Sequence, residues 1–418
     1  MRKLLPTPKG YVADSDKVCS PEETVARAKA AFARFGSGIL AETRRIDTGR
    51  LGIPVFLSVC GEKAREIMPT RKQMGKGASP AQAEASALME LVERYSFFSF
   101  WSTPGNFREL TWSEAQAAWP GQVMPLQEIL RAAGDPLSLT AAAEIMDLVS
   151  WRFTLARNLT HGREEWIPLD FFKKLNEFNG SSAGNGLEES ILQGACELVE
   201  RHVCAVADRT RPTTPTIDLD AVEDGVLGRL ADAFRREGIF LLLKDFSLGM
   251  PVPTVAALAY DPATFPDASE IVFTAGTAAS PVKAAIRAVT EIAQLAGDFE
   301  TKSNHEASGL PKFTHPADFA WLLDGPKTTL AAMPGIERGD ILEELGLLAR
   351  GLGDKGLCLY SVETTHPQLS LVANYNVVPG FLFRERTPNA SLGLFVGRIL
   401  AEEKIGEMLD NLSGDFEV

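Results

Sequence analysis

The chain has 418 residues, 45% of them hydrophobic and 23% charged, so it is long enough to bury a large core. A formal net charge of −13 argues against a nucleic-acid partner, because such a surface would not neutralise phosphates in bulk. No apolar run reaches the length of a signal peptide or a membrane span, so we expect a cytoplasmic protein without a membrane partner. Five scattered cysteines without a CxxC pair favour neither a disulfide framework nor a zinc site.

Helical and strand patterns intermingle along the chain, which predicts one mixed α/β unit rather than separate domains. In chain order we predict a helix over 21–35, a strand over 53–59, a helix over 80–100, irregular structure over 104–136, strands over 143–154 and 165–169, a helix over 188–207, a strand over 270–275, helices over 281–295 and 339–352, and strands over 358–362 and 371–378. Glycine-rich loops precede two of the long helices, at 75–77 and 180–186.

The pentapeptide Glu-Leu-Val-Glu-Arg occurs twice, at 90–94 and 197–201, each time within a predicted helix. At about 100° per residue, its polar side chains share one face with other polar residues of the same helix. That face holds Ser86, Glu90, Glu93 and Arg94 in the first helix, and Glu189, Gln193, Glu197, Glu200, Arg201 and Cys204 in the second. A third helix places Arg287, Glu291 and Gln294 on one face.

A solvated face with i,i+4 charge pairs is the usual meaning of such a stripe. Here the other sides of the first two helices are almost entirely apolar, which predicts burial and requires partners for the carboxylates. Carboxylates that meet from separate helices repel one another unless a cation lies between them. Hard oxygen ligands suit Mg²⁺, and interleaved arginines suit phosphate oxygens.

Known phosphate and nucleophile motifs do not explain the pattern. Gly75-Lys76 is followed by glycine, and position 70 is Thr, so this segment is not a P-loop. Gly180, Ser182 and Gly184 match GxSxG, but the polar segment before them is a poor strand for a nucleophile elbow.

With these motifs the sequence resembles the YcaO family, in particular its stand-alone bacterial members, over at least residues 17–381. The resemblance rests on GKGASPAQAEASALMELVER, NGSSAGNGLEESILQGACELVERH, AAIRAVTEIAQ and a short VVPGF. It implies a YcaO-type fold, with helices packed on mostly antiparallel or mixed sheets, and an ATP site without a Walker motif. Within one domain we expect an N-terminal segment at 1–58, a nucleotide-binding core at 59–300 and a C-terminal part at 301–418.

The resemblance also implies which residues bind ATP and Mg²⁺. ATP would be bound by Lys17, Thr24, Lys76, Ser86, Glu90, Arg94, Ser182, Asn185, Glu189, Arg201 and Arg287, and Mg²⁺ by Glu90, Glu93, Glu197, Glu200 and Glu291. Thr24 stands where the family pattern has Ser. No catalytic residue is assigned.

The implied activity is ATP- and Mg²⁺-dependent activation of a peptide or protein backbone amide, which leads to a thioamide or an azoline. The expected partners are that substrate and a sulfur-donor or substrate-presenting protein, and we expect a homodimer. Azoline-forming members often end in a proline-rich tail, whereas this sequence ends DNLSGDFEV, which favours the thioamide. The alternative function is a nucleotide-binding accessory protein that assists a sulfur-inserting partner of the methylthiolation type. The stand-alone bacterial protein also has a C-terminal helical-repeat region for which this chain is too short, so that role transfers less directly.

Overall fold

The structure is a computed structural model that describes residues 1–10, 17–47, 49–222, 225–296, 299, 309–369, 371–384 and 391–414. Side chains are described for all of these except 296, 403 and 405–414. None of the described helices is long and apolar enough to span a membrane.

The described residues form three β-sheets in which antiparallel pairing dominates. The first has the order β1 (Leu40–Arg45), β2 (Val55–Cys60), β3 (Lys72–Lys76). The second has the order β11 (Val272–Thr277), β10 (Thr254–Tyr260), β9 (Phe240–Asp245), β8 (Thr216–Ile217), β12 (Lys327–Thr328), and its β8–β12 pair is parallel. The third has the order β4 (Arg108–Leu110), β5 (Trp151–Asn158), β13 (Tyr360–Glu363), β14 (Val372–Val377), β7 (Ser181–Gly184), with β6 (Arg163–Pro168) paired to β5.

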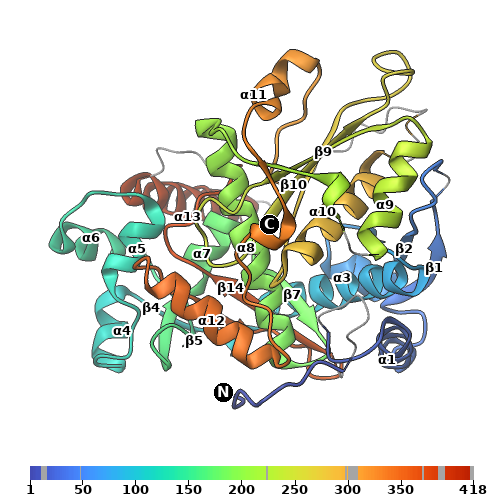
Figure 1. The fold of residues 1–418 in the computed structure, drawn as a ribbon. Coiled ribbons are helices and arrows are strands. Elements are labelled where there is room, and N and C mark those ends of the chain that lie inside the picture. Colours follow the sequence, from blue (N-terminus) through green and yellow to red (C-terminus); the bar gives the residue numbers. More distant parts are fainter. Residues whose placement is uncertain are drawn as a thin grey trace.

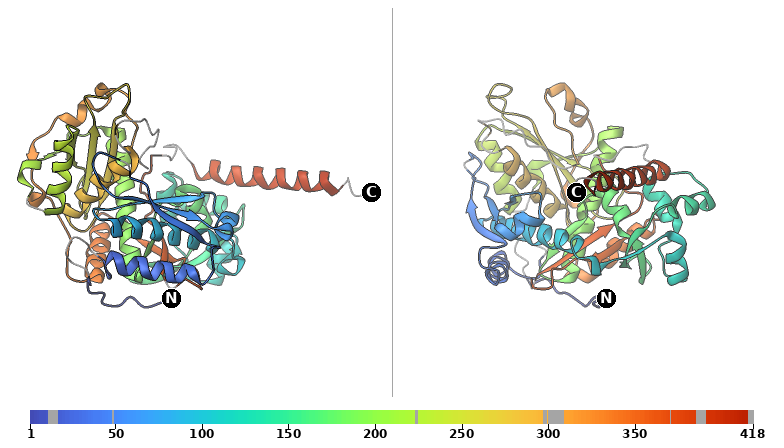
Figure 2. Two further views of the ribbon diagram at one scale, coloured as in Figure 1. Left: turned by 90° about the vertical axis from the view of Figure 1, so that its right-hand side faces the viewer. Right: turned by 180° about the vertical axis from the view of Figure 1, so that it is seen from behind.

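Three long helices connect these sheets (Figure 1). They are α3 (Pro80–Trp101), which packs on β2 and β3, α8 (Leu187–Thr210), which packs on β7 and β14, and α10 (Pro281–Ala296), which packs on β10 and β11. Other described helices are α1 (Pro21–Ala33), α2 (Glu62–Ile67), α7 (Leu169–Asn176), α9 (Gly225–Arg236), α11 (Ala320–Leu323) and α12 (Ile341–Gly353). The final helix, α13 (Leu392–Gly414), begins against the third sheet and then runs away from the rest of the molecule (Figure 2). The mixed α/β fold with antiparallel and mixed sheets is confirmed.

The prediction of irregular structure over 104–136 was wrong. This stretch contains α4 (Trp112–Ala118) and α5 (Leu126–Ala133), and α6 (Leu139–Met146) extends into the segment predicted as a strand over 143–154. Local capping explains the difference, because Thr111 and Glu114 form a reciprocal capping box at the start of α4. Gly134 ends α5 in the left-handed conformation that glycine adopts without cost. High Pro, Gly and Trp content concealed these short capped helices.

The expected boundaries at residues 58 and 300 stay a prediction, and the first of them falls within β2. The strands β1, β3, β9 and β10 and the helices α2, α9 and α13 were not predicted.

The close approach of α8 to the third sheet depends on Gly194. A Cβ atom at this position would lie 2.2 Å from Asn376 Nδ2 and 2.5 Å from Ser182 Oγ, well inside van der Waals contact. The helix backbone can therefore lie directly against β7 and β14 only because this residue has no side chain. This packing sets how closely α8 lies against β7 and β14, and it thereby helps to position the polar residues of the helix.

We predict that Gly194→Ala lowers the free energy of unfolding by about 2 kcal/mol or more, because the added methyl group must push two buried side chains aside. Gly228→Ala is the matched control, since Gly228 also lies in a helix and a Cβ there meets nothing within 4 Å. That variant should be stabilised by about 0.5–1 kcal/mol through the helix propensity of alanine. Chemical denaturation of both variants measures the difference, and equal stability would contradict the packing account.

Candidate functional site

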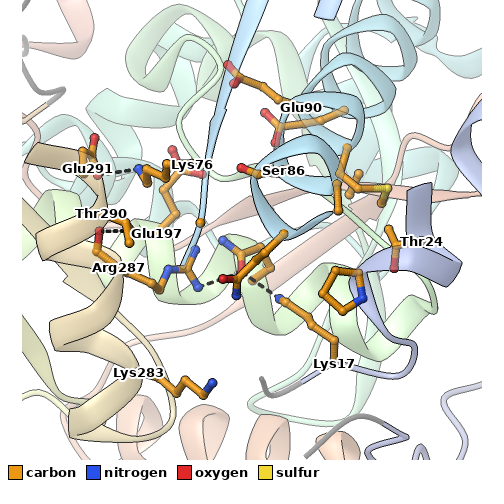
Figure 3. A pocket seen from close by; sticks show the side chains of 18 of the residues that line it. Lys17, Thr24, Lys76, Ser86, Glu90, Glu197, Lys283, Arg287, Thr290 and Glu291 are labelled. Carbon is orange, nitrogen blue, oxygen red and sulfur yellow. Dashed lines mark hydrogen bonds and ion pairs between the residues drawn. The ribbon is translucent and has the colours of Figure 1, made fainter. Parts of the chain in front are cut away.

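A cavity of about 400 Å³ lies where α3, α8, α10, β3 and the segment 17–24 meet (Figure 3). Its volume is within the range of small-molecule sites in proteins. All the predicted ATP- and metal-binding residues line it except one: Lys17, Thr24, Lys76, Ser86, Glu90, Glu93, Arg94, Asn185, Glu189, Glu197, Glu200, Arg201, Arg287 and Glu291. Residues from four separate parts of the sequence therefore come together around one space.

Ser182 is the predicted residue that does not line the cavity. Its side chain is fully buried, and its hydroxyl donates to the backbone carbonyl of Ser190 at 2.7 Å. The same hydroxyl accepts from Asn376 Nδ2 at 3.2 Å. Through these two hydrogen bonds Ser182 connects β7 to the first turn of α8 and to β14. Because the Ser182 hydroxyl is buried and hydrogen-bonded, it is not the exposed nucleophile that a GxSxG nucleophile elbow requires.

The first Glu-Leu-Val-Glu-Arg motif forms a mixed-charge group on α3. Arg94 lies 3.3 Å from Glu93 and 3.8 Å from Glu90, and its guanidinium stacks on the ring of Phe178 at 4.1 Å from the ring centroid. Burial raises the pKa of Glu93 to about 8, with a further increase from the nearby Glu197 and Glu90 carboxylates that Arg94 only partly opposes. Burial also raises the pKa of Glu90. One arginine does not neutralise this group of carboxylates.

The second motif repeats the arrangement on α8. Arg201 lies 3.5 Å from Glu197 and 3.8 Å from Glu200. Burial raises the pKa of Glu200 to about 7, and the Glu291 carboxylate on α10 adds to the increase. Repetition of the pentapeptide in sequence thus becomes repetition of an acid–arginine group on two walls of the cavity.

A lysine from the first sheet meets a carboxylate from the third long helix. Lys76, the last residue of β3, donates to Glu291 Oε2 on α10 at 2.7 Å (Figure 3). This ion pair joins two walls of the cavity that belong to different sheets.

The Glu189 carboxylate is one of the groups that attach the segment before α1 to the start of α8. Glu189 accepts from the backbone N–H of Val18 at 2.8 Å and from the backbone N–H of Asn185 at 3.0 Å. Asn185 Nδ2 in turn donates to Thr24 Oγ1 at 3.0 Å. These contacts place Lys17 and Thr24 at the cavity, where the family resemblance led us to expect them. In this arrangement Glu189 organises the backbone around the cavity.

The donor set fits Mg²⁺ that arrives with a phosphate ligand. Among the described residues, no group of three or more His, Cys, Asp or Glu residues is gathered closely enough to hold a metal ion. Mg²⁺ commonly binds through one or two carboxylates, with phosphate oxygens and water completing the shell, so a preformed protein cage is not required. Burial is the main cause of the raised pKa values of Glu90, Glu93 and Glu200, and a cation in the cavity would oppose its effect.

Other residues that line the cavity were not predicted as site residues. Lys283, Thr290 and Gln294 come from α10. Gln294 Oε1 is buried without a hydrogen-bond partner among the described residues, so it is an oxygen ligand or acceptor available to the cavity. Lys283 lies one helical turn before Arg287, and the same periodicity could have identified it. Nothing in the sequence pattern indicates the stacking of Phe178 on Arg94.

Comparison with known proteins adds an independent observation. A family model described as YcaO cyclodehydratase, ATP- and Mg²⁺-binding, matches residues 74–382, which is most of the chain. An uncharacterised protein of Methanothermobacter thermautotrophicus is 28% identical over 66% of this chain and 69% of its own length. An uncharacterised protein from the tfuA 3′ region of Rhizobium leguminosarum bv. trifolii is 26% identical over 87% of this chain and 88% of its own. The ribosomal protein S12 methylthiotransferase accessory factor YcaO of Escherichia coli is 28% identical over 45% of this chain, but only 35% of its own length.

Solved structures share the fold at low sequence identity. A heterocyclase in complex with substrate and cofactor superposes with a TM-score of 0.70 at 21% identity, over 91% of this chain and 54% of that chain. YcaO from Methanopyrus kandleri, bound with AMPPCP and Mg²⁺, superposes with a TM-score of 0.63 at 19% identity, over 90% of this chain and 94% of that chain. This chain therefore spans about half of the heterocyclase and nearly all of the Methanopyrus protein.

The raised pKa of Glu93 predicts a specific pH dependence of stability in the absence of ligand. Its pKa of about 8 lies above the ordinary value of 4.5, so the stability contributed by this carboxyl is complete below pH 4.5 and is lost as the pH rises through about 8. The wild-type protein should lose up to about 1.4 kcal/mol of its free energy of unfolding per pH unit across this range. We predict that Glu93→Gln, whose side chain cannot ionise, does not show this loss. Thermal or chemical unfolding of the ligand-free protein at several pH values measures the slope.

Glu84→Gln is the control for this experiment because Glu84 lies on the same helix and outside the cavity. Although burial acts to raise the pKa of Glu84, hydrogen bonds from Lys29 and Thr43 lower it overall. Its contribution to stability is therefore lost only as the pH falls below the ordinary carboxyl range, and Glu84→Gln should leave the slope between pH 5 and about pH 8 unchanged. Parallel profiles for wild type and Glu93→Gln would contradict the prediction.

Proposed function

This chain belongs to the YcaO family of ATP- and Mg²⁺-dependent backbone-modifying enzymes, and we propose that it uses ATP to phosphorylate the oxygen of a peptide or protein backbone amide, which yields a thioamide. The observation that carries the proposal is the convergence of acid–arginine groups from α3 and α8 with the Lys76–Glu291 pair on one cavity. That arrangement supplies both signs of charge that a magnesium triphosphate requires.

In this proposal the cavity residues divide by charge. Arg94, Arg201 and Arg287 bind phosphate oxygens through their planar guanidinium groups, while Lys76 and Lys17 contribute point charges. Glu90, Glu93, Glu197, Glu200 and Glu291 would hold the cation through their carboxylate oxygens. The metal supplies charge neutralisation on the transferring phosphoryl group. Burial of the site strengthens each of these electrostatic interactions.

The conversion of the amide into a thioamide requires a hydrosulfide equivalent as its second reactant. The sulfur attacks the amide carbon, and the former carbonyl oxygen becomes an alkoxide. That oxygen attacks the γ-phosphorus of ATP, which breaks the bond to the β-phosphate and releases ADP. Loss of inorganic phosphate, which carries the amide oxygen, then forms the C=S bond. The proton that was on sulfur leaves with the phosphate, so no oxidant or reductant is consumed.

The proposal takes sulfur exchange, and not ring closure to an azoline, as the outcome of amide activation. The proposal includes a partner protein that donates sulfur or presents the substrate. It also includes a homodimer. The relative from the tfuA 3′ region, which matches over 88% of its length, supports action beside the product of a neighbouring gene.

The second candidate function is that of an accessory protein which binds nucleotide and assists a sulfur-inserting partner. It is supported by the E. coli relative, whose name is that of an accessory factor for a methylthiotransferase. The two functions differ in turnover, because an accessory protein would bind nucleotide without converting an amide itself.

Isotope transfer tests the proposed chemistry. We predict that the purified chain binds AMPPCP only in the presence of Mg²⁺. With ATP, sodium sulfide and a peptide pool labelled with ¹⁸O at the backbone carbonyls, it should release ¹⁸O-labelled inorganic phosphate. Mass spectrometry should find peptides in which sulfur replaces oxygen. Phosphate that carries only solvent oxygen would contradict amide activation, and Mg²⁺-dependent binding without turnover would favour the accessory function.

Removing one carboxylate should impair catalysis without unfolding the chain. We predict that Glu93→Gln and Glu200→Gln each lower kcat for ATP hydrolysis by about 10²-fold or more, the scale seen when one charge-stabilising group is lost from an active site. Initial rates at saturating Mg²⁺ measure the effect, and unfolding curves confirm that the variants remain folded. Glu84→Gln should keep the wild-type rate. Wild-type turnover in either cavity variant would argue against the assignment.

A further inference from the structure

A second cavity, of about 540 Å³, shares no lining residue with the cavity described above. Its walls are residues 1–4, the hairpin of β5 and β6, and α12, which lie near the N-terminus in Figure 1. We call it the α12 groove. Its volume is within the range of ligand sites in proteins.

Much of the lining of the α12 groove is apolar. The apolar side chains come from all three walls and are those of Leu4, Leu159, Leu342, Leu345 and Ala349. Gly346 lies among them on α12, and a Cβ atom there would meet only Arg350 Nη1, at 3.6 Å. The groove therefore has room for an apolar side chain from another molecule against the surface of this helix.

The charged side chains that line the groove are mostly cationic, although the whole chain has a formal net charge of −13. They are Arg2, Lys3, Arg157 and Arg163, with Glu164 as the one acid. Arg2 forms an ion pair with Glu363, and Arg163 forms one with Glu165. The local charge is thus opposite in sign to that of the chain.

Arg157 is the cation of the groove that the protein compensates least. Its guanidinium donates to the backbone carbonyl of Arg2, and the described residues offer it no carboxylate at ion-pair distance. Burial lowers the pKa of Arg157, and the more distant carboxylates of Glu164, Glu363 and Glu188 only partly oppose this effect. An anion that enters the groove would therefore stabilise this half-buried charge.

The segment before α1 connects the groove to the first cavity. Beyond residues 1–4, the backbone N–H of Leu5 donates to Glu188 on α8 at 2.7 Å. Further along, the backbone N–H of Val18 donates to the adjacent Glu189 at 2.8 Å, and Glu189 lines the first cavity. An enzyme that acts on a long polypeptide can use contacts remote from the reacting amide to position that amide.

We propose that the α12 groove binds a segment of the polypeptide substrate away from the reacting amide, and that it selects segments in which an apolar side chain stands beside a carboxylate. The apolar side chain packs on α12 at Gly346, and the carboxylate pairs with Arg157. The inference rests on the proposed function, because it takes the substrate to be a polypeptide.

Two synthetic peptides test the chemistry of the groove. The acidic probe is a fluorescent heptapeptide in which leucine and glutamate alternate, and the basic probe has lysine in place of each glutamate. Fluorescence anisotropy at physiological salt should show that the acidic probe binds about tenfold more tightly or better, because only its carboxylates pair with Arg157. General attraction to a chain of net charge −13 would favour the basic probe, and that result would overturn the inference.

Two variants, each with a matched control on α9, test whether the probe occupies the groove. Arg157→Met should weaken the affinity for the acidic probe about tenfold, the scale of one lost hydrogen bond to a charged group, while Arg229→Met at an exposed position should leave it unchanged. Gly346→Phe fills the groove and should abolish binding, while Gly228→Phe should not. Unchanged affinity in both groove variants would overturn the inference.

Cross-linking locates the probe without any substitution in the protein. With benzoylphenylalanine in place of one leucine of the acidic probe, mass spectrometry of the irradiated complex should find cross-links within 157–164 or 342–349. Cross-links confined to other parts of the chain would overturn the inference. If a groove variant does not fold, this measurement with the wild-type chain carries the test.

Competition shows whether the occupant of the groove is the substrate. The acidic probe should inhibit release of ¹⁸O-labelled phosphate from the labelled peptide pool, whereas the basic probe should not. Binding without inhibition would overturn the inference. So would sedimentation in which Gly346→Phe or the acidic probe dissociates a dimer, because the occupant would then be a second copy of this chain.

Failure of this inference can be told apart from failure of the proposed function. Release of ¹⁸O-labelled phosphate without binding of the acidic probe would overturn only the role of the groove. An acidic probe cross-linked in the groove of a chain that releases no ¹⁸O-labelled phosphate would overturn the proposed function.

Discussion

The burial of many charged side chains around one cavity is the constraint on which the rest of this structure depends. Six glutamates from three helices line one cavity together with six lysine and arginine side chains, and burial of the glutamates carries a desolvation cost. A folded chain bears such a cost only when other packing overcomes it, because desolvated carboxylates favour their protonated form. The raised pKa values of Glu93 and Glu200 express that cost directly. The ligand-free protein is therefore poised for a cation.

The scaffold that bears this cost is apolar and closely packed. On α8, Leu198 and Val199 are fully buried, and Gly194 allows the helix to lie closely against the third sheet. Hydrogen bonds from Ser182 and Asn376 connect β7 to the first turn of α8 and to β14 at that junction. Contacts between uncharged groups thus set the position of the carboxylates. The residues that hold the site in place therefore differ from the charged residues that line it.

The three long helices and their polar faces could be predicted from the sequence because helical periodicity is local information. A repeated pentapeptide amid apolar residues was enough to place Glu93 and Glu200 on buried faces. The capped helices within 104–136 were concealed, since their signals are single residues such as Thr111 and Gly134 within an otherwise loop-like composition. The role of Ser182 was equally hidden, because motif spacing does not reveal which way a strand turns its side chains.

Gln193 marks the limit of sequence reasoning about the site. Its place on the acidic face follows from periodicity, but its two hydrogen-bond partners, Lys17 and Arg287, lie 176 residues before it and 94 residues after it. Which side chains a polar residue contacts depends on tertiary distances that no local pattern contains.

The Lys76–Glu291 ion pair has a mechanical consequence. It crosses between the first sheet and the helix that covers the second, so it is a cross-link between two bodies of the fold as well as a charge pair at the cavity. A cation that draws Glu291 toward itself must loosen that cross-link, while a phosphate that draws Lys76 replaces it with a bridge through the ligand. Occupancy of the cavity would thereby change one of the contacts that hold the two sheets together. A bound nucleotide would then contribute contacts that hold the fold together. The protein without nucleotide would be less rigid than the protein with nucleotide bound.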